Sequence, residues 1–260
     1  MTTSYHVHTR WSDGHADLPG YIDAAKASAL AELGVSDHLA LTPDGRTPGW
    51  SMTAGDLTGY VAELRGTTTL DGLVLRAGIE ADYFPETVSL LGRTLAPFDF
   101  DYVLGSVHVV DGFAIDSNSK DWAGLSRQRQ DELWSRYWLR VAEMAATGLF
   151  DIAAHLDLPK KFGFHPSRAV TTEAEAALDA IAAAGMAVEV NTSGWHAPAA
   201  EAYPSPALLR AAHERRIPIV INADAHRPEH VARDFDRAAA LVRELGCGRT
   251  VRFERRRMIL

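Results

Sequence analysis

The sequence predicts one mixed α/β domain over residues 1–260, built on a closed barrel of parallel strands. Short apolar or β-branched segments alternate with longer helical segments along the whole chain, a pattern typical of strand–helix–strand units with right-handed crossovers. About seven or eight such units follow one another without a Pro- or Ser-rich linker, an internal repeat or a low-complexity tract. No Gly-rich phosphate loop follows the first expected strand, so a dinucleotide-binding Rossmann domain is disfavoured.

The expected strands are short and rich in apolar or β-branched residues. They are Ser4–Thr9, Glu32–Ser36, Leu73–Ile79, Tyr102–Val107, Asp151–Ala154, Ala187–Val190, Pro218–Asn222 and Thr250–Phe253. Two irregular pieces, Thr42–Met52 and Asp111–Leu125, follow the second and fourth of these strands. In a barrel they become loops at the carboxyl ends of the strands, the face where barrel enzymes build their active sites.

The expected helices show apolar residues at helical spacing or recognisable start and stop signals. They are Asp17–Leu33, Thr171–Ala184, Pro204–Arg215 and Pro228–Leu245. The second opens with threonines that can cap a helix and ends at Gly185, while the other three carry proline near the first turn.

Composition excludes several classes of protein. Apolar residues make up 47% and charged residues 23% of the chain, as in globular proteins, and the formal net charge of −8 argues against a nucleic-acid partner. No basic-then-apolar leader and no apolar run approaching ~18 residues is present, so we expect a cytoplasmic protein without a membrane partner. A single cysteine, Cys247, allows no internal disulfide, and Arg255-Arg256-Arg257 is expected to be a solvated tail.

Side chains that bind metals follow the carboxyl end of almost every expected strand. In chain order they are His6, His8, Asp13, His15, Asp37, His38, Glu80, Asp82, His108, His155, Asp157, Asn191, Asp224 and His226. His6 and His8 face one side of their strand because strand side chains alternate, and imidazoles and carboxylates packed this densely are costly without compensating cations. The set lacks thiolates, so it suits Zn²⁺, Mn²⁺ or Fe²⁺, and its size suits three ions that share a bridging carboxylate. Such clusters activate water and neutralise a phosphoryl group during transfer.

Seven short motifs carry these residues in a fixed order. They are His6-Val-His8-Thr, Ser12-Asp-Gly-His15, Val35-Ser-Asp-His38, Gly78-Ile-Glu80, Gly105-Ser-Val-His108, His155-Leu-Asp and Asp224-Ala-His226. Together they resemble the motifs of the polymerase-and-histidinol-phosphatase (PHP) superfamily, and the segments around Lys160, Glu189 and Tyr203 are most similar to its histidinol-phosphate phosphatases. The resemblance implies a distorted (β/α)7 barrel with three divalent ions at the carboxyl ends of its strands.

The resemblance also implies a ligand set. It assigns His6, His8, Glu80 and Asp224 to one ion, Glu80, His108 and His155 to a second, and His15, His38 and His226 to a third. Four neighbouring aspartates, Asp13, Asp37, Asp82 and Asp157, are expected to orient imidazoles or else to serve as caps and turn residues.

The expected reaction is hydrolysis of a small phosphomonoester, L-histidinol phosphate, to L-histidinol and phosphate. Glu80 is expected to hold the ions around the attacking water, and Asp224, His226 or a metal-bound water to supply the proton that the leaving oxygen needs. Close relatives often carry a basic residue after Asn-Thr-Ser-Gly, where this chain has Trp195-His196. The candidates that remain to bind the phosphate or the rest of the substrate are Lys160, Lys161, Arg168, Asn191, His196 and Arg227.

Other interpretations stay open at this point. A related phosphoesterase acting on another small phosphomonoester or a nucleotide has the same ligands, because fold and site chemistry do not fix the substrate. An amidohydrolase barrel also begins with His-x-His, but it commonly uses a lysine on the fourth strand, where this chain has His108. A metal-binding module without activity would need a site with no open coordination position. The oligomeric state is left open.

Overall fold

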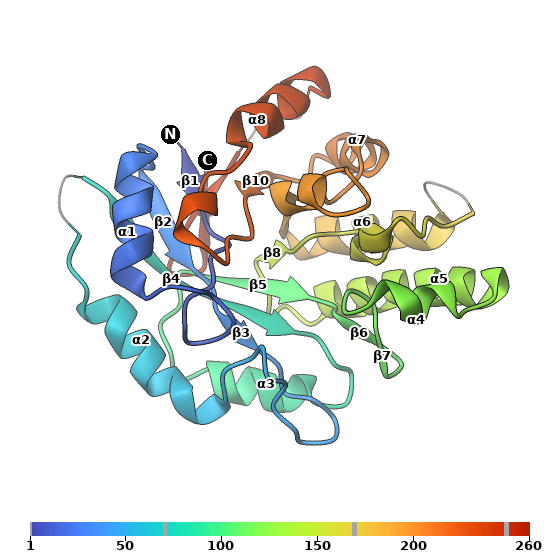
Figure 1. Ribbon diagram of the computed structural model, residues 1–260, viewed down its shortest axis with the longest axis horizontal. Helices are drawn as coiled ribbons and strands as arrows, with labels where there is room; N and C mark the ends of the chain where they lie inside the picture. Colours follow the sequence, from blue (N-terminus) through green and yellow to red (C-terminus); the bar gives the residue numbers. More distant parts are fainter. Residues whose placement is uncertain (1, 70–71, 168–170, 247–249) are drawn as a thin grey trace.

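Parallel strands form a nearly closed barrel with helices packed around its outside (Figure 1). The computed structural model describes residues 2–69, 72–167, 171–246 and 250–260. Neighbouring strands follow the order β1-β2-β4-β5-β8-β9-β10, and β3 pairs with β4 beyond the end of β2. The barrel strands are β1 (Thr3–Ser4), β2 (Glu32–Val35), β3 (His38–Leu39), β4 (Val74–Asp82), β5 (Tyr102–Ser106), β8 (Ile152–Ala153), β9 (Ala187–Asn191) and β10 (Ile219–Asn222). The predicted fold class is therefore confirmed.

The helices follow the strands as the barrel requires. They are α1 (Leu18–Ala27), α2 (Leu57–Gly66), α3 (Val88–Leu95), α4 (Ser119–Ala123), α5 (Arg127–Ala146), α6 (Thr172–Ala184), α7 (Pro206–Glu214) and α8 (Phe235–Glu244). Short 3₁₀ turns are η1 (Ala54–Asp56), η2 (Leu158–Phe162), η3 (Thr192–His196) and η4 (Pro228–His230). Across the part of the chain that the structure describes, no helix is both long and apolar enough to span a membrane.

Sequence signals explain two helix boundaries and miss a third. The side chain of Thr171 accepts a hydrogen bond from the Ala174 backbone nitrogen at 3.2 Å, and Gly185 ends α6 in the left-handed region, both as predicted. The helix expected over residues 228–245 is broken. It consists of η4 and then α8, because Asp234 adopts a left-handed backbone with φ 60° between them.

The first strand is much shorter than predicted, because side chains take its backbone donors. Past Ser4, the Tyr5 nitrogen donates to Asn222 Oδ1 and the Thr9 nitrogen to Asp37 Oδ1, each at 2.7 Å. Val7 pairs with Ala225 in an isolated parallel bridge. This bridge closes the barrel beside the two histidines of the first strand and the segment that follows β10.

The last predicted strand does not join the barrel wall. Residues of β11 (Arg252–Glu254) pair antiparallel with β12 (Arg257–Ile259), and the hairpin is attached to the barrel where the Val251 nitrogen donates to the Ile219 oxygen at 3.0 Å. The basic cluster forms the hairpin turn and is not a free tail. The Arg256 guanidinium pairs with Asp151 and donates to the Leu149 oxygen.

A buried carboxylate stabilises the amino ends of the strands, the end of the barrel opposite to the histidines. Glu32, at the start of β2, accepts hydrogen bonds from Tyr5 Oη at 2.6 Å, Arg76 Nε at 3.0 Å and Arg252 at 3.0 Å. Burial raises the pKa of Glu32, but the hydrogen bonds from Arg76 and Tyr5 outweigh it and bring the pKa below its ordinary value. The side chain is therefore ionised at neutral pH and contributes to stability.

Candidate metal centre and active site

Glu80 lies at the centre of the histidine cluster. It is the seventh residue of β4, is 1% exposed, and turns its two carboxylate oxygens toward different imidazoles. Its Oε1 lies 2.9 Å from His155 Nε2 and 3.8 Å from His108 Nε2. Its Oε2 lies 2.9 Å from His6 Nε2, 3.4 Å from His8 Nε2 and 3.0 Å from His38 Nδ1. One carboxylate with imidazoles around both oxygens has the arrangement of a bridging ligand.

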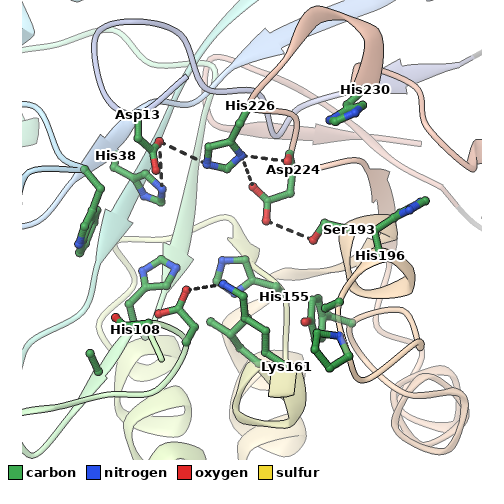
Figure 2. Close-up of a pocket in the computed structure, with 18 of the residues that line it drawn as sticks. Asp13, His38, His108, His155, Lys161, Ser193, His196, Asp224, His226 and His230 are labelled. Atoms are coloured by element: carbon green, nitrogen blue, oxygen red, sulfur yellow. Dashed lines mark hydrogen bonds and ion pairs between the residues drawn. The ribbon is translucent and has the colours of Figure 1, made fainter. Parts of the chain in front are cut away.

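The structure brings together eight of the nine predicted metal ligands. Four overlapping groups each place their ligand atoms within 4.8 Å of one another: His8, Asp13, His38 and His226; His6, Glu80 and His155; His6, His8 and Asp224; and His38, Glu80 and His108. They come from the carboxyl ends of β3, β4, β5, β8 and β10 and from the segment after β1. Figure 2 shows several of these imidazoles and carboxylates pointing into one space.

His15 is the exception, because the structure does not bring its side chain to the cluster. Its side chain is exposed and belongs to none of the four groups, although its backbone nitrogen donates to the His226 oxygen at 2.8 Å. Asp13 lies in its place. One carboxylate oxygen of Asp13 lies 3.3 Å from His226 Nε2 and 3.8 Å from His38 Nε2, so Asp13 is a candidate ligand and not only an orienting residue.

The donor atoms fit metal ions. Two ligands at about 2.1 Å from one ion lie about 3.0–3.4 Å apart, and the separations around Glu80 and Asp13 fall near this range. Both ring nitrogens of His8, Nδ1 of His38 and Nδ1 of His155 are buried without a hydrogen-bond partner in the described part of the chain. Buried nitrogens of this kind are costly and rare unless another group satisfies them. A bound cation would satisfy those that point toward the carboxylates.

The carboxylates of the cluster are ionised. Burial raises the pKa of Glu80 and of Asp224, but the neighbouring imidazoles outweigh it and hold both pKa values well below their usual range. Burial also raises the pKa of Asp13, but the neighbouring imidazoles, above all that of His226, outweigh it and lower the pKa to about 2. Asp224 also adopts a left-handed backbone with φ 52°, a strained conformation of the type that accumulates at functional sites.

Two further carboxylates orient the imidazoles. Asp82 Oδ1 lies 2.8 Å from His108 Nδ1, which leaves Nε2 of that ring facing Glu80, as predicted. Glu189 was not predicted to have a role. Its Oε1 lies 2.7 Å from His6 Nδ1, and its Oε2 accepts from the His155 backbone nitrogen at 2.7 Å. The sequence signal was present, because Glu189 and Asn191 alternate on one face of β9.

The other two predicted orienting aspartates hold loops instead. Asp37 accepts from the Thr9 nitrogen at 2.7 Å and from Ser12 Oγ at 2.6 Å, which shapes the loop that carries Asp13. Asp157 pairs with Lys160 Nζ at 3.0 Å and contacts no imidazole among the described residues. These two were predicted to orient imidazoles, and their alternative role as turn residues is the one the structure has.

A cavity of about 780 Å³ opens above the cluster. Among the predicted substrate-binding residues, Lys161 and His196 line it. Lys161 Nζ pairs with Asp116 Oδ2 at 3.1 Å, and His196 Nε2 lies 2.5 Å from Asp234 Oδ2. In Figure 2 the Lys161 side chain rises toward the cluster, with His196 and Ser193 to its right.

Three predicted substrate-binding residues lie elsewhere. Lys160 is 1% exposed, and its ammonium is bound by Asp157, Glu201 at 2.7 Å and the Ala202 oxygen at 2.8 Å, so no donor is left for a substrate. Asn191 is buried and uses its amide group to bind Glu189 at 3.0 Å and Asp224 at 3.2 Å. Arg227 is exposed and is not among the cavity-lining residues. Arg168 and Cys247 lie outside the described residues.

Other residues give the cavity an aromatic wall and an acidic wall. Trp50 packs edge-on against His38 and His108, with ring centroids 4.9 Å and 5.5 Å away. Asp116 is ionised, because His108 and Lys161 outweigh the effect of burial and lower its pKa. Both lie in the two loops that the sequence predicted for this face. Arg233, which the sequence did not single out, lines the cavity as well.

Fold and site together define a (β/α) barrel protein whose strand ends present clustered imidazoles and carboxylates. The chain belongs to the PHP domain family, whose family model matches residues 4–193. A curated relative, the probable histidinol-phosphatase of Deinococcus radiodurans, is 39% identical over 256 residues, covering 97% of this chain and 96% of the relative. The histidinol-phosphatase of Bacillus subtilis is 24% identical over 257 residues, covering 89% of this chain and 96% of the relative.

A solved structure agrees with the fold. The histidinol phosphate phosphatase of Lactococcus lactis, complexed with zinc, L-histidinol and phosphate, matches with a TM-score of 0.79 at 18% identity. The match covers 100% of this chain and 99% of the other.

Proposed function

We propose that this protein hydrolyses L-histidinol phosphate to L-histidinol and phosphate with the help of divalent metal ions. The observation that carries the proposal is the cluster at the strand ends, where Glu80 turns both carboxylate oxygens toward imidazoles beneath an open cavity. The near-complete match to a relative described as a probable histidinol-phosphatase supports the substrate.

Three ions, Zn²⁺, Mn²⁺ or Fe²⁺, suit the donor set, which contains imidazole and carboxylate without thiolate. The proposed ligands are His6, His8, Glu80 and Asp224 for the first, Glu80, His108 and His155 for the second, and Asp13, His38 and His226 for the third. Bound divalent ions supply a nucleophilic water at neutral pH and offset the charge of the phosphoryl oxygens.

The protein's own contribution is to hold the ligand side chains in place and to fix the tautomer of His226. His226 Nδ1 lies 3.1 Å from the Asp224 carbonyl oxygen, so Nδ1 carries the proton and Nε2 is free to act as a ligand. Asn191 donates to Asp224 Oδ2 at 3.2 Å and thereby leaves Oδ1 toward the first-strand histidines. Asp224 and His226 line the cavity, but the proposed site uses both as ligands and Asp224 is ionised, so we place the source of the proton for the leaving oxygen at a water molecule held beside them.

The cavity walls suit the two ends of the substrate. Lys161 and His196 are proposed to face the phosphate, since both line the cavity and carry N–H donors. The imidazole and ammonium of histidinol are cationic or aromatic groups. Trp50 offers them an aromatic wall and Asp116 an ionised carboxylate, which is shared with Lys161 at 3.1 Å.

Phosphate release from L-histidinol phosphate by the Zn²⁺- or Mn²⁺-loaded protein tests the proposal. A panel of other phosphomonoesters, a nucleotide, a phosphodiester and metal-stripped protein run beside it. We expect a preference of about a hundredfold in kcat/KM, on the order of 3 kcal/mol, for histidinol phosphate. Metal-dependent turnover of the panel without that preference would favour a related phosphoesterase for another small phosphomonoester or nucleotide. No turnover of any ester by metal-loaded protein would refute the proposal.

The remaining expectations belong to the same proposal. They are a small-molecule substrate with no nucleic-acid partner, a cytoplasmic location, and one functional domain over residues 1–260. An amidohydrolase activity is disfavoured, because β5 is followed by His108, where amidohydrolase barrels commonly carry a bridging lysine.

A further inference from the structure

We propose that Arg233 binds the phosphate group of the substrate, an inference that rests on the proposed phosphatase function. Arg233 follows the last barrel strand by eleven residues and lies between η4 and α8. It lines the same cavity as Asp224 and His226. The sequence offers Lys160 and Arg227 for this task, but the structure buries the first among carboxylates and leaves the second outside the cavity.

The guanidinium of Arg233 has a buried nitrogen without a hydrogen-bond acceptor. Its Nε is buried and has no hydrogen-bond partner, and no carboxylate forms an ion pair with it in the described part of the chain. Buried N–H groups without acceptors are rare in folded proteins, and those that persist at a cavity wall point to a bound ligand. Asp234 and Asp224 are near enough to influence its charge but do not accept from it.

The other two donors proposed to face the phosphate each have an acidic partner. Lys161 is paired with Asp116 at 3.1 Å, and His196 lies 2.5 Å from Asp234. Arg233 is therefore the cavity-lining lysine or arginine, within the described ranges, that has no acidic partner. A phosphate monoester brings two negative charges and several acceptor oxygens, which match the planar array of donors of a guanidinium.

Backbone contacts hold Arg233 in place. Its carbonyl oxygen accepts from Thr192 Oγ1 at 2.8 Å, and its nitrogen donates to the His230 oxygen at 3.0 Å. Thr192 opens the turn after β9, so the loops that follow two neighbouring strands are joined at this residue. The positioned backbone reduces the freedom that the side chain would lose when it binds an anion.

Three variants at Arg233 test the proposal in the metal-loaded protein: Arg233→Gln, Arg233→Lys and Arg233→Ala. For each we would measure KM and kcat for L-histidinol phosphate, the inhibition constants of inorganic phosphate and of L-histidinol, and the bound metal. Arg233→Gln should weaken phosphate inhibition at least about tenfold and lower kcat/KM about a hundredfold, while inhibition by L-histidinol and metal content stay within about twofold. Arg233→Lys should fall between, and added guanidinium ions should restore part of the activity of Arg233→Ala.

Arg237→Gln is the matched control, because its exposed guanidinium lies over the Trp195 ring at 4.1 Å and outside the cavity. It should leave both inhibition constants unchanged. Unchanged phosphate inhibition in Arg233→Gln would overturn the proposal, and so would parallel loss of phosphate binding, histidinol binding and metal, which marks a structural role. If the wild type binds inorganic phosphate through Arg233 but cleaves no ester, the proposed function fails while this inference stands.

Discussion

Replacing Asp13 tests the assignment in which the structure departs most from the sequence. One oxygen of Asp13 lies 3.3 Å from His226 Nε2, 3.8 Å from His38 Nε2 and 4.0 Å from His8 Nδ1. Asp13→Asn keeps the shape of the side chain and removes the anionic oxygen that would bind the third ion. Loss of a residue that merely supports a ligand weakens metal binding about 10–100-fold, so loss of the ligand itself should cost at least about 100-fold, or about 2.7 kcal/mol.

The assay is metal content per chain after dialysis against a series of chelator concentrations, measured beside phosphatase activity. Asp13→Asn should release one ion at a chelator concentration at which the wild type retains it, and activity should fall with that ion. His15→Asn is the matched control from the same loop, and because His15 is exposed it should behave as the wild type. The reverse result, with the ion lost from His15→Asn and kept by Asp13→Asn, would refute the structural assignment and restore the sequence prediction.

Three further outcomes follow from the contacts around the site and the barrel. Lys160→Met leaves the buried carboxylate of Asp157 unpaired and should lower the free energy of unfolding by about 3 kcal/mol in urea titrations. Lys161→Met should instead lower kcat/KM with the free energy of unfolding unchanged, and equal effects of the two variants would contradict this division. Glu32→Gln should also lower the free energy of unfolding by about 3 kcal/mol near neutral pH. The pKa of Glu32 is lowered in the folded protein, so its contribution to the free energy of unfolding is complete above the ordinary pKa of about 4.3 and disappears as pH falls through the folded pKa. A difference in stability between Glu32→Gln and the wild type that does not change with pH would contradict this prediction. Asp82→Asn should weaken metal binding about 10–100-fold by freeing the ring of His108, measured by chelator competition.

The cluster of candidate metal ligands was predictable because parallel strands bring their carboxyl ends to one place. Glu80 and His6 are 74 residues apart in sequence, yet Glu80 lies near the carboxyl end of β4 and His6 just after β1, and their ligand atoms lie 2.9 Å apart. Strand periodicity and strand order are sufficient to predict this proximity.

The choice between Asp13 and His15 was not predictable, because both lie in the loop after the first strand. The loop folds back so closely that a Cβ on Gly14 would lie 1.9 Å from the His8 carbonyl oxygen. This approach requires glycine, and it turns Asp13 toward His8 while His15 faces outward. The sequence shows that Gly14 is present, but it does not predict whether the turn directs Asp13 or His15 toward the site.

Residues proposed to bind the substrate are harder to predict than the candidate metal ligands, for the same physical reason. Lys160 and Lys161 are adjacent, and only the 3₁₀ turn η2 decides that one enters the core and the other faces the cavity. Arg233 reaches the cavity from a loop held by Thr192, forty-one residues earlier in the chain. Loop side chains of this kind depend on contacts between distant segments, and short-range patterns do not encode those contacts. Substrate preference among PHP barrels that share the same ligands should therefore vary through these loops, and exchanges at Lys161 and Arg233 should change it without loss of metal.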